Sequence, residues 1–175
     1  MSRILGVMRR LSWVVPDIED AMQHWIRRLG VGPFFHVPHL KPDSFQFEGK
    51  NSAVDLSIAL AYSGPVQIEL IQQHNTAPSM YQTALSAGHS GPHHVGFFST
   101  EFDAMTQKML LSGHGIGQSG RVLGDCRFAH FATRNQPGII VELIELDDAL
   151  AAAFDAFKTA ASDWDGSEPV RDLPL

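Results

Sequence analysis

The feature that most constrains the fold of this chain is an order of predicted elements that occurs twice. One strand, one helix and three strands follow one another in the first half, and the same order recurs in the second half. Neither half could close a core alone, so we expect the two to pack side by side. The predicted strands are residues 7–15, 33–35, 53–62 and 66–72 in the first half, and residues 92–99, 116–122, 126–133 and 139–146 in the second.

Residues at equivalent positions support this duplication. The strand end Leu11–Val14 and the helix start that follows it are similar to Val95–Phe98 and the helix start beyond it. The apolar strand Ile68–Ile71 is similar to Val141–Ile144, and each contains a single glutamate. Each half therefore begins with a similar strand and helix, and ends with a similar strand.

The remaining segments are expected to be helices and loops. Helical spacing of apolar residues predicts helices over residues 18–29 and 101–111, and a further helix over residues 75–87. Residues 36–52, with two prolines and a glycine, predict a long loop, and an alanine-rich helix is expected over residues 147–161. Residues 162–175 are polar and are expected to form a loose tail. The predicted fold class is α+β, with one domain over residues 4–146 made of a first module (about 4–74) and a second (about 90–146).

Composition excludes several classes of function. The 19 acidic residues outnumber the 13 basic ones and give a net charge of −6, the wrong sign for general binding to nucleic acid or to an anionic membrane. Cys126 is the one cysteine, so an intramolecular disulfide is excluded. The sequence has no apolar run of membrane-spanning length and no signal-peptide pattern. We therefore expect a cytoplasmic protein whose partners are small molecules or a second copy of itself.

Two glutamates at equivalent positions carry the strongest indication of chemistry. Glu69 and Glu142 each interrupt an otherwise apolar strand, where a carboxylate is costly unless it is paired, hydrogen-bonded or bound to a cation. The alternative is that each faces solvent on a half-exposed sheet. Their occurrence in both halves makes chance placement a weaker explanation.

A pair of histidines begins the second half. On a regular strand His93 and His94 point to opposite faces, so at most one of them joins a given site directly. His94 is the counterpart of Arg10 in the first half. A lone histidine on a strand is most often an ordinary core or surface residue, but this strand begins a half that ends in Glu142.

These segments together resemble the vicinal oxygen chelate superfamily, which includes glyoxalase I, methylmalonyl-CoA epimerase, extradiol dioxygenases and the bleomycin resistance proteins. The resemblance covers about residues 4–146 and is nearest to the glyoxalase and epimerase branch. No single motif is specific, but the order and spacing of the motifs match. The segments that carry it are Val14–Met22, Leu29–Phe35, Val66–Ile71, His93–Phe97 and Val141–Ile144.

The resemblance implies two βαβββ modules whose sheets curl around a cleft, with a divalent metal held by one residue from each of four strands. Carried over position by position, Glu69, His94 and Glu142 match three metal-ligand places. The implied ion is Mg²⁺, Mn²⁺, Co²⁺, Ni²⁺ or Zn²⁺. The fourth place falls on Arg10, where the family usually has histidine or glutamine.

Arg10 leaves two alternatives open, because arginine stays protonated and cannot bind a metal. If its side chain points away, Glu69, His94, Glu142 and water could still hold an ion. If it points inward, it pairs with Glu69 or Glu142 and takes the place of the cation. The pocket is then metal-free, with a fixed positive group suited to a carboxylate or an enolate oxygen.

The resemblance implies a lyase or isomerase that removes a proton next to a carbonyl group of a small carbonyl or acyl-thioester substrate. Glu69 or Glu142 would be the catalytic base, and Arg10 and His130 are candidates for binding the substrate, although a core or surface place also suits His130. The alternative is a metal-free protein of the bleomycin-resistance type that sequesters a ligand without catalysis. A homodimer is implied as well.

Overall fold

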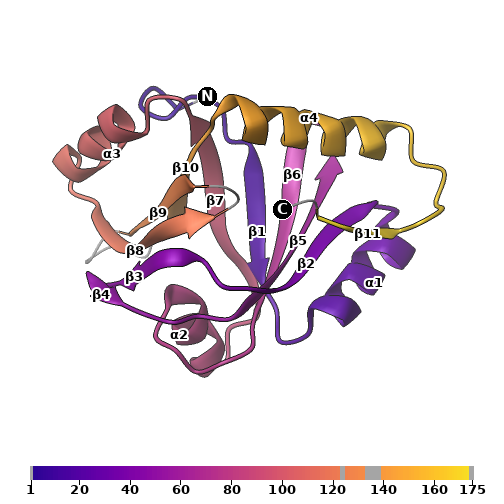
Figure 1. The fold of residues 1–175 in the computed structure, drawn as a ribbon, viewed down its shortest axis with the longest axis horizontal. Helices are drawn as coiled ribbons and strands as arrows, with labels where there is room; N and C mark the ends of the chain where they lie inside the picture. The colour runs from indigo at the N-terminus through magenta and orange to yellow at the C-terminus, as the bar shows by residue number, and fades with distance from the viewer. Residues whose placement is uncertain (1, 123–124, 133–138, 174–175) are drawn as a thin grey trace.

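The computed structural model of this protein describes residues 2–122, 125–132 and 139–173. In this part of the chain, strands form one mixed sheet that curls on itself, and helices pack on both of its faces (Figure 1). The order of strands across the sheet is β11-β2-β5-β6-β1-β7-β10-β9-β8-β3-β4. The elements are β1 (Arg10–Val14), α1 (Ile18–Leu29), β2 (Phe34–Leu40), β3 (Asp43–Phe47), β4 (Lys50–Asn51), β5 (Leu56–Ser63), β6 (Val66–Gln73), α2 (Met80–Ser86), β7 (Gly91–Ser99), α3 (Phe102–Leu111), β8 (Gly115–Val122), β9 (Cys126–Ala132), β10 (Ile140–Glu145), α4 (Asp148–Ser162) and β11 (Val170–Asp172).

The predicted α+β fold class is confirmed, and the two halves meet in the middle of the sheet. Strand β1 begins the first half and pairs antiparallel with β7, which begins the second. On either side, β6 pairs in parallel with β1, and β10 pairs in parallel with β7. The four central strands are therefore the first and last strands of the two halves.

Helices α1 and α3 cover the outer face of the sheet. Helix α1 begins after Asp17, whose side chain accepts a hydrogen bond from the N–H of Asp20, and ends at Gly30 in a left-handed conformation. Its buried residues Ile18 and Met22 pack with Leu70 of β6. Helix α3 packs in the same way in the second half, on residues of β7, β9 and β10.

Helix α4 lies on the inner face, across one end of the central strands (Figure 1). Its buried residues Leu150, Phe154 and Phe157 join the core that also contains Leu60 of β5 and Ile144 of β10. None of the helices in the described ranges is long and apolar enough to span a lipid bilayer. Because α4 packs into the inner core, it limits the space that is left on the inner face of the sheet.

Strands occupy the region that the sequence predicted to be a long loop. Residues 36–52 contain most of β2, all of β3 and all of β4. The loop prediction is wrong because these strands depend on partners far along the chain: β2 pairs with β5, and β3 pairs with β8. Pairing of this kind outweighs the local preference of a proline-containing segment.

The C-terminal tail is not loose as far as Leu173. Strand β11 pairs in parallel with β2 at the sheet edge, and the side chain of Leu173 is buried in the inner core. The polar composition of the tail did not indicate this pairing, because it depends on β2, an edge strand from the first half of the chain. Thr133, which was predicted to end a strand, and residues 174–175 of the tail lie outside the described residues. The predicted boundaries of the domain and its modules stay predictions.

Candidate functional site

The predicted site residues come together on the inner face of the sheet. Arg10 lies on β1, Glu69 on β6, His94 on β7, Glu142 on β10 and His130 on β9, and each strand turns the named side chain toward the same region. At most 4% of the surface of each of these residues is exposed. Burial of this many ionisable groups in one place requires that they satisfy one another.

Gly96 makes the meeting of these side chains sterically feasible. It lies on β7 directly between Arg10 of β1 and Glu142 of β10. A Cβ atom on Gly96 would lie 2.8 Å from the Cβ of Arg10 and 3.1 Å from Oε2 of Glu142. These distances are too short for a side chain at position 96, so glycine leaves the space over which Arg10 reaches the carboxylates.

The guanidinium of Arg10 points into the site. Its Nη1 atom donates to Oε1 of Glu69 at 2.9 Å and to Oε2 of Glu142 at 3.1 Å, and its Nε atom donates to Oε1 of Gln67 at 2.7 Å. The ring of Phe98 lies 5.2 Å from its Cζ atom, within the range of a cation–π contact. Of the two orientations that the sequence left open, the structure has the inward one, and the cation position is filled by arginine.

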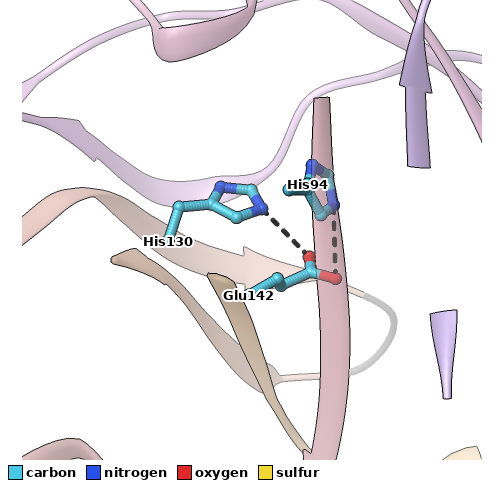
Figure 2. A group of neighbouring side chains, drawn as sticks. All are labelled: His94, His130 and Glu142. Atoms are coloured by element: carbon cyan, nitrogen blue, oxygen red, sulfur yellow. Dashed lines mark ion pairs between the residues drawn. The ribbon is translucent and has the colours of Figure 1, made fainter. Parts of the chain in front are cut away.

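Two imidazoles, those of His94 and His130, face the carboxylate of Glu142 (Figure 2). Nε2 of His94 lies 3.2 Å from Oε2 of Glu69 and 3.4 Å from Oε2 of Glu142, and Nε2 of His130 lies 3.3 Å from Oε1 of Glu142. These distances are short, but neither Nε2 atom makes a hydrogen bond of acceptable angle, and both are fully buried. Each of these ring nitrogens therefore lies against a carboxylate without a well-aligned hydrogen bond.

The charges in the site balance one another. Burial alone would raise the pKa values of Glu69 and Glu142, but the Arg10 guanidinium lowers both, and Glu142 is held well below its usual range. Burial would likewise lower the pKa of His94, but the charge of Glu142 and contacts with both carboxylates raise it to about 9. Burial and the nearby His94 lower the pKa of His130. At neutral pH, therefore, two cations face two carboxylates, and His130 is neutral.

A narrow pocket opens onto this charged group. Arg10, Glu69 and Glu142 form its polar end, and its volume of about 40 Å³ has room for about three water molecules. Leu150 and Phe154 of α4, together with Leu173, close one side. The rest of the wall is Val37, Leu40, Ile58, Leu60, Tyr81, Val122, Phe128 and Ile144.

Comparison of the sequence with known families identifies the superfamily of this chain. The sequence profile described as the Glyoxalase/Bleomycin resistance protein/Dioxygenase superfamily matches residues 9–130. The chain belongs to this superfamily. The matched range contains Arg10, Glu69, His94 and His130, whereas Glu142 lies beyond its end. No match was found among curated proteins.

Solved structures of the superfamily fold are similar to this chain. Methylmalonyl-CoA epimerase from Mycobacterium tuberculosis has a TM-score of 0.61 at 16% identity, over 87% of this chain and 95% of the epimerase chain. A hypothetical protein from Bacillus halodurans has a TM-score of 0.59 at 15% identity, over 81% of this chain and 95% of its own. A Streptomyces coelicolor methylmalonyl-CoA epimerase variant in complex with 2-nitronate-propionyl-CoA has a TM-score of 0.57 at 13% identity, over 82% and 96%. At these identities the likeness establishes the fold.

The metal that the superfamily resemblance implies does not fit the site in this arrangement. By distance, His94, His130 and Glu142 could hold an ion, since their ligand atoms lie within 4.8 Å of one another. A divalent ion at this point, however, must compete with the Arg10 guanidinium for Glu142 and displace the proton from Nε2 of His94. It would also lie beside a fixed positive charge. This group shares His94 and Glu142 with the ligand set that the resemblance implies but has His130 in place of Glu69, and the negative charge of Glu142 is already neutralised by the protein.

The stability of the protein should depend on the protonation of His94. Its pKa of about 9 in the folded protein exceeds the ordinary value of 6.5, so the stabilisation is complete below pH 6.5 and is lost as the pH rises through 9. We expect the free energy of unfolding to fall by up to about 3 kcal/mol across this range. Urea unfolding at both ends of this pH range measures the fall in the free energy of unfolding. In a His94→Gln variant the free energy of unfolding should depend much less on pH. An equal pH dependence in both proteins would contradict the assignment of this effect to His94.

Several residues of the site were not predicted from the sequence. Ser12 donates to Oε2 of Glu69 at 2.6 Å, and Gln67 links Arg10 to the hydroxyl of Tyr62. The alternation of β1 and β6 places Ser12 and Gln67 on the same face as Arg10 and Glu69, so this pattern could have identified both. The place of Gly96 could not be identified in this way, because it depends on which strands are neighbours.

Proposed function

We propose that the pocket is a metal-independent acid–base site that moves a proton on the carbon next to a carbonyl group of a small substrate. This is the isomerase or lyase chemistry of the glyoxalase and epimerase type. The observation that carries the proposal is the pair of buried Nε2 atoms of His94 and His130 that lack a hydrogen bond. Both face the carboxylates, and Arg10 faces the same carboxylates. Buried N–H groups whose contacts with the carboxylates are poorly aligned are suited to an oxygen that becomes negative during reaction.

In this proposal Arg10 performs the electrostatic task that a metal performs elsewhere. A substrate oxygen that accepts a hydrogen bond from the guanidinium competes with Glu142 for it. Because Arg10 lowers the pKa of Glu142 whereas burial raises it, loss of that contact makes the carboxylate a stronger base. Glu142 or Glu69 then takes the proton from carbon, and the enolate oxygen stays with Arg10 and the imidazole N–H groups.

The pocket walls limit the substrate. A volume of about 40 Å³ is far below the several hundred Å³ of ordinary ligand pockets. The substrate must therefore present a small carbonyl group to the polar end, or Leu150, Phe154 and Leu173 must move to admit a larger one. The proposed partner is a small molecule, and the homodimer that the resemblance implies stays a prediction.

A second candidate is a protein that binds a ligand in the pocket without catalysis. The observation that favours it is the closed ion-pair network, in which Arg10 holds both carboxylates and lowers their pKa values. Ion-paired carboxylates are weak bases, so a ligand that leaves the network intact is bound and not converted.

Exchange of substrate protons with deuterated solvent separates the two candidates. We expect the chelator-treated protein to catalyse exchange of the proton next to the carbonyl of an acyl-thioester or hydroxyketone probe, followed by NMR. Probe binding without exchange supports the sequestering candidate. Exchange that disappears on chelator treatment and returns with an added divalent ion contradicts the metal-independent proposal.

A further inference from the structure

A second layer of hydrogen bonds lies behind the two imidazoles that contact the carboxylates of the pocket. On one side, Gln118 of β8 connects the backbone N–H of Met80 to the ring of His130. On the other, His93 connects the backbone carbonyl of Met80 to the ring of His94. The first residue of helix α2 is thus the shared anchor for both imidazoles, and it lies outside the pocket described above.

The link through Gln118 determines which nitrogen of His130 carries the proton. The N–H of Met80 donates to Oε1 of Gln118 at 2.8 Å, so the amide oxygen is on the Met80 side. The amide Nε2 therefore faces Nδ1 of His130, at 2.6 Å, and it can only donate. Nδ1 of His130 must accept this hydrogen bond. The proton of the neutral ring is consequently on Nε2, the atom that faces Glu142.

The link through His93 exists because of a β-bulge. Ser12 of β1 is paired with His94, but its neighbour Trp13 is paired with Pro92, so His93 is an extra residue on β7. The bulge corrects the expectation that adjacent histidines point apart: their Nδ1 atoms lie 2.9 Å from each other. The Met80 carbonyl can only accept, so Nε2 of His93 donates to it, and Nδ1 of His93 accepts from Nδ1 of His94.

We propose that Gln118 is a positioning residue that fixes His130 as an N–H donor toward Glu142 at the polar end of the pocket, so that this end recognises an oxygen of a carbonyl or carboxylate group and not a metal ion. Gln118 and His130 are 1% and 0% exposed, so this hydrogen bond is shielded from bulk solvent. A ring with its proton on Nε2 has no lone pair there for a metal. The role of Gln118 in recognising a substrate oxygen rests on the proposed function, whereas the proton position in the ligand-free protein does not.

A change of one atom type at position 118 tests the proposal. In a Gln118→Glu variant the carboxylate still accepts from Met80 but accepts from His130 instead of donating to it, so Nδ1 of the ring should become protonated. Long-range ¹H–¹⁵N spectra at neutral pH distinguish a protonated ring nitrogen from an unprotonated one. We expect protonated Nε2 in the wild-type protein and protonated Nδ1 in the variant. Gln46→Glu makes the same change at an exposed position and should leave the His130 signals unchanged.

Two further results complete the test. If Gln118→Glu does not fold, a Gln118→Met variant removes the donor without adding charge and should show both proton positions. A ring whose Nδ1 stays unprotonated in every folded variant overturns the proposal, as does a wild-type ring protonated on Nδ1. Where the deuterium exchange assay succeeds, Gln118→Glu should slow exchange about 100-fold, the usual loss for one donor to a developing oxyanion. Absence of exchange in the wild-type protein removes the proposed function but leaves the spectroscopic result standing.

Discussion

Replacing Arg10 with histidine should give the pocket one tightly bound divalent ion per chain, with an affinity at least about a thousandfold above that of the wild-type protein. The change removes a buried positive charge that contacts both carboxylates, whose repulsion at a distance of about 4 Å is about 4 kcal/mol for each unit of charge on an ion, so a thousandfold is the minimum gain for a divalent ion. It also places an imidazole beside Glu69, His94 and Glu142. Elemental analysis after equilibration with Zn²⁺, Mn²⁺ or Ni²⁺, together with titration calorimetry, measures the gain.

An Arg10→Met variant separates the removal of charge from the addition of a ligand. It should bind an ion more weakly than Arg10→His, because it supplies no donor atom. It should also be less stable than the wild-type protein by about 3–5 kcal/mol, since Glu69 and Glu142 lose the partner that neutralises them. If the wild-type protein holds one ion per chain with an affinity that Arg10→His does not change, the view that Arg10 excludes a metal is wrong.

The sequence predicted the centre of the site because the duplication identifies equivalent positions. Glu69 and Glu142 end the two halves, and Arg10 and His94 begin them. Parallel pairing of β1 with β6 and of β7 with β10 then brings the four strands side by side. A residue at the same place in each module lies at the same place around the cleft. This symmetry made the four residues predictable, although the orientation of Arg10 was not.

The second layer of hydrogen bonds was not predictable, for a local reason. The strand pattern places His93 on the face opposite His94, and one extra residue in the register with β1 reverses that result. A bulge of this kind leaves no mark in the alternation of apolar and polar residues. Gln118 lies in a glycine-rich stretch, and its function depends on Met80 of a helix 38 residues away in the sequence.

The closure of the pocket was missed because it depends on the C-terminal segment. Residues 147–161 predict an alanine-rich helix, and α4 is indeed a helix, but its sequence does not indicate which face of the sheet it covers. The position of α4 follows from Phe154 and Phe157, which pack into the inner core, and from β11, which ties the chain end to β2. The same contacts leave the small volume that restricts the substrate.

A Glu142→Gln variant should lose proton exchange by a factor of about 10²–10⁴, the usual contribution of a positioned base. Glu142 lies within 3.4 Å of Arg10, His94 and His130, so it faces every donor that would hold the enolate oxygen. An amide at this position keeps the shape of the side chain but cannot take a proton. Exchange of the probe proton in deuterated water measures the loss of catalysis, and calorimetry measures whether the variant still binds the probe.

The matched control is Glu145→Gln on the same strand. Glu145 pairs with Arg127 outside the pocket, so its replacement should leave exchange unchanged. Glu69→Gln identifies the base: if Glu142 takes the proton, Glu69→Gln should slow exchange less than Glu142→Gln does. Unchanged exchange in Glu142→Gln, with a large loss in Glu69→Gln, would assign the base to the first module. Binding retained in both variants, with no exchange in the wild-type protein, would instead leave the ion-pair network as a recognition site for an oxygen-bearing ligand.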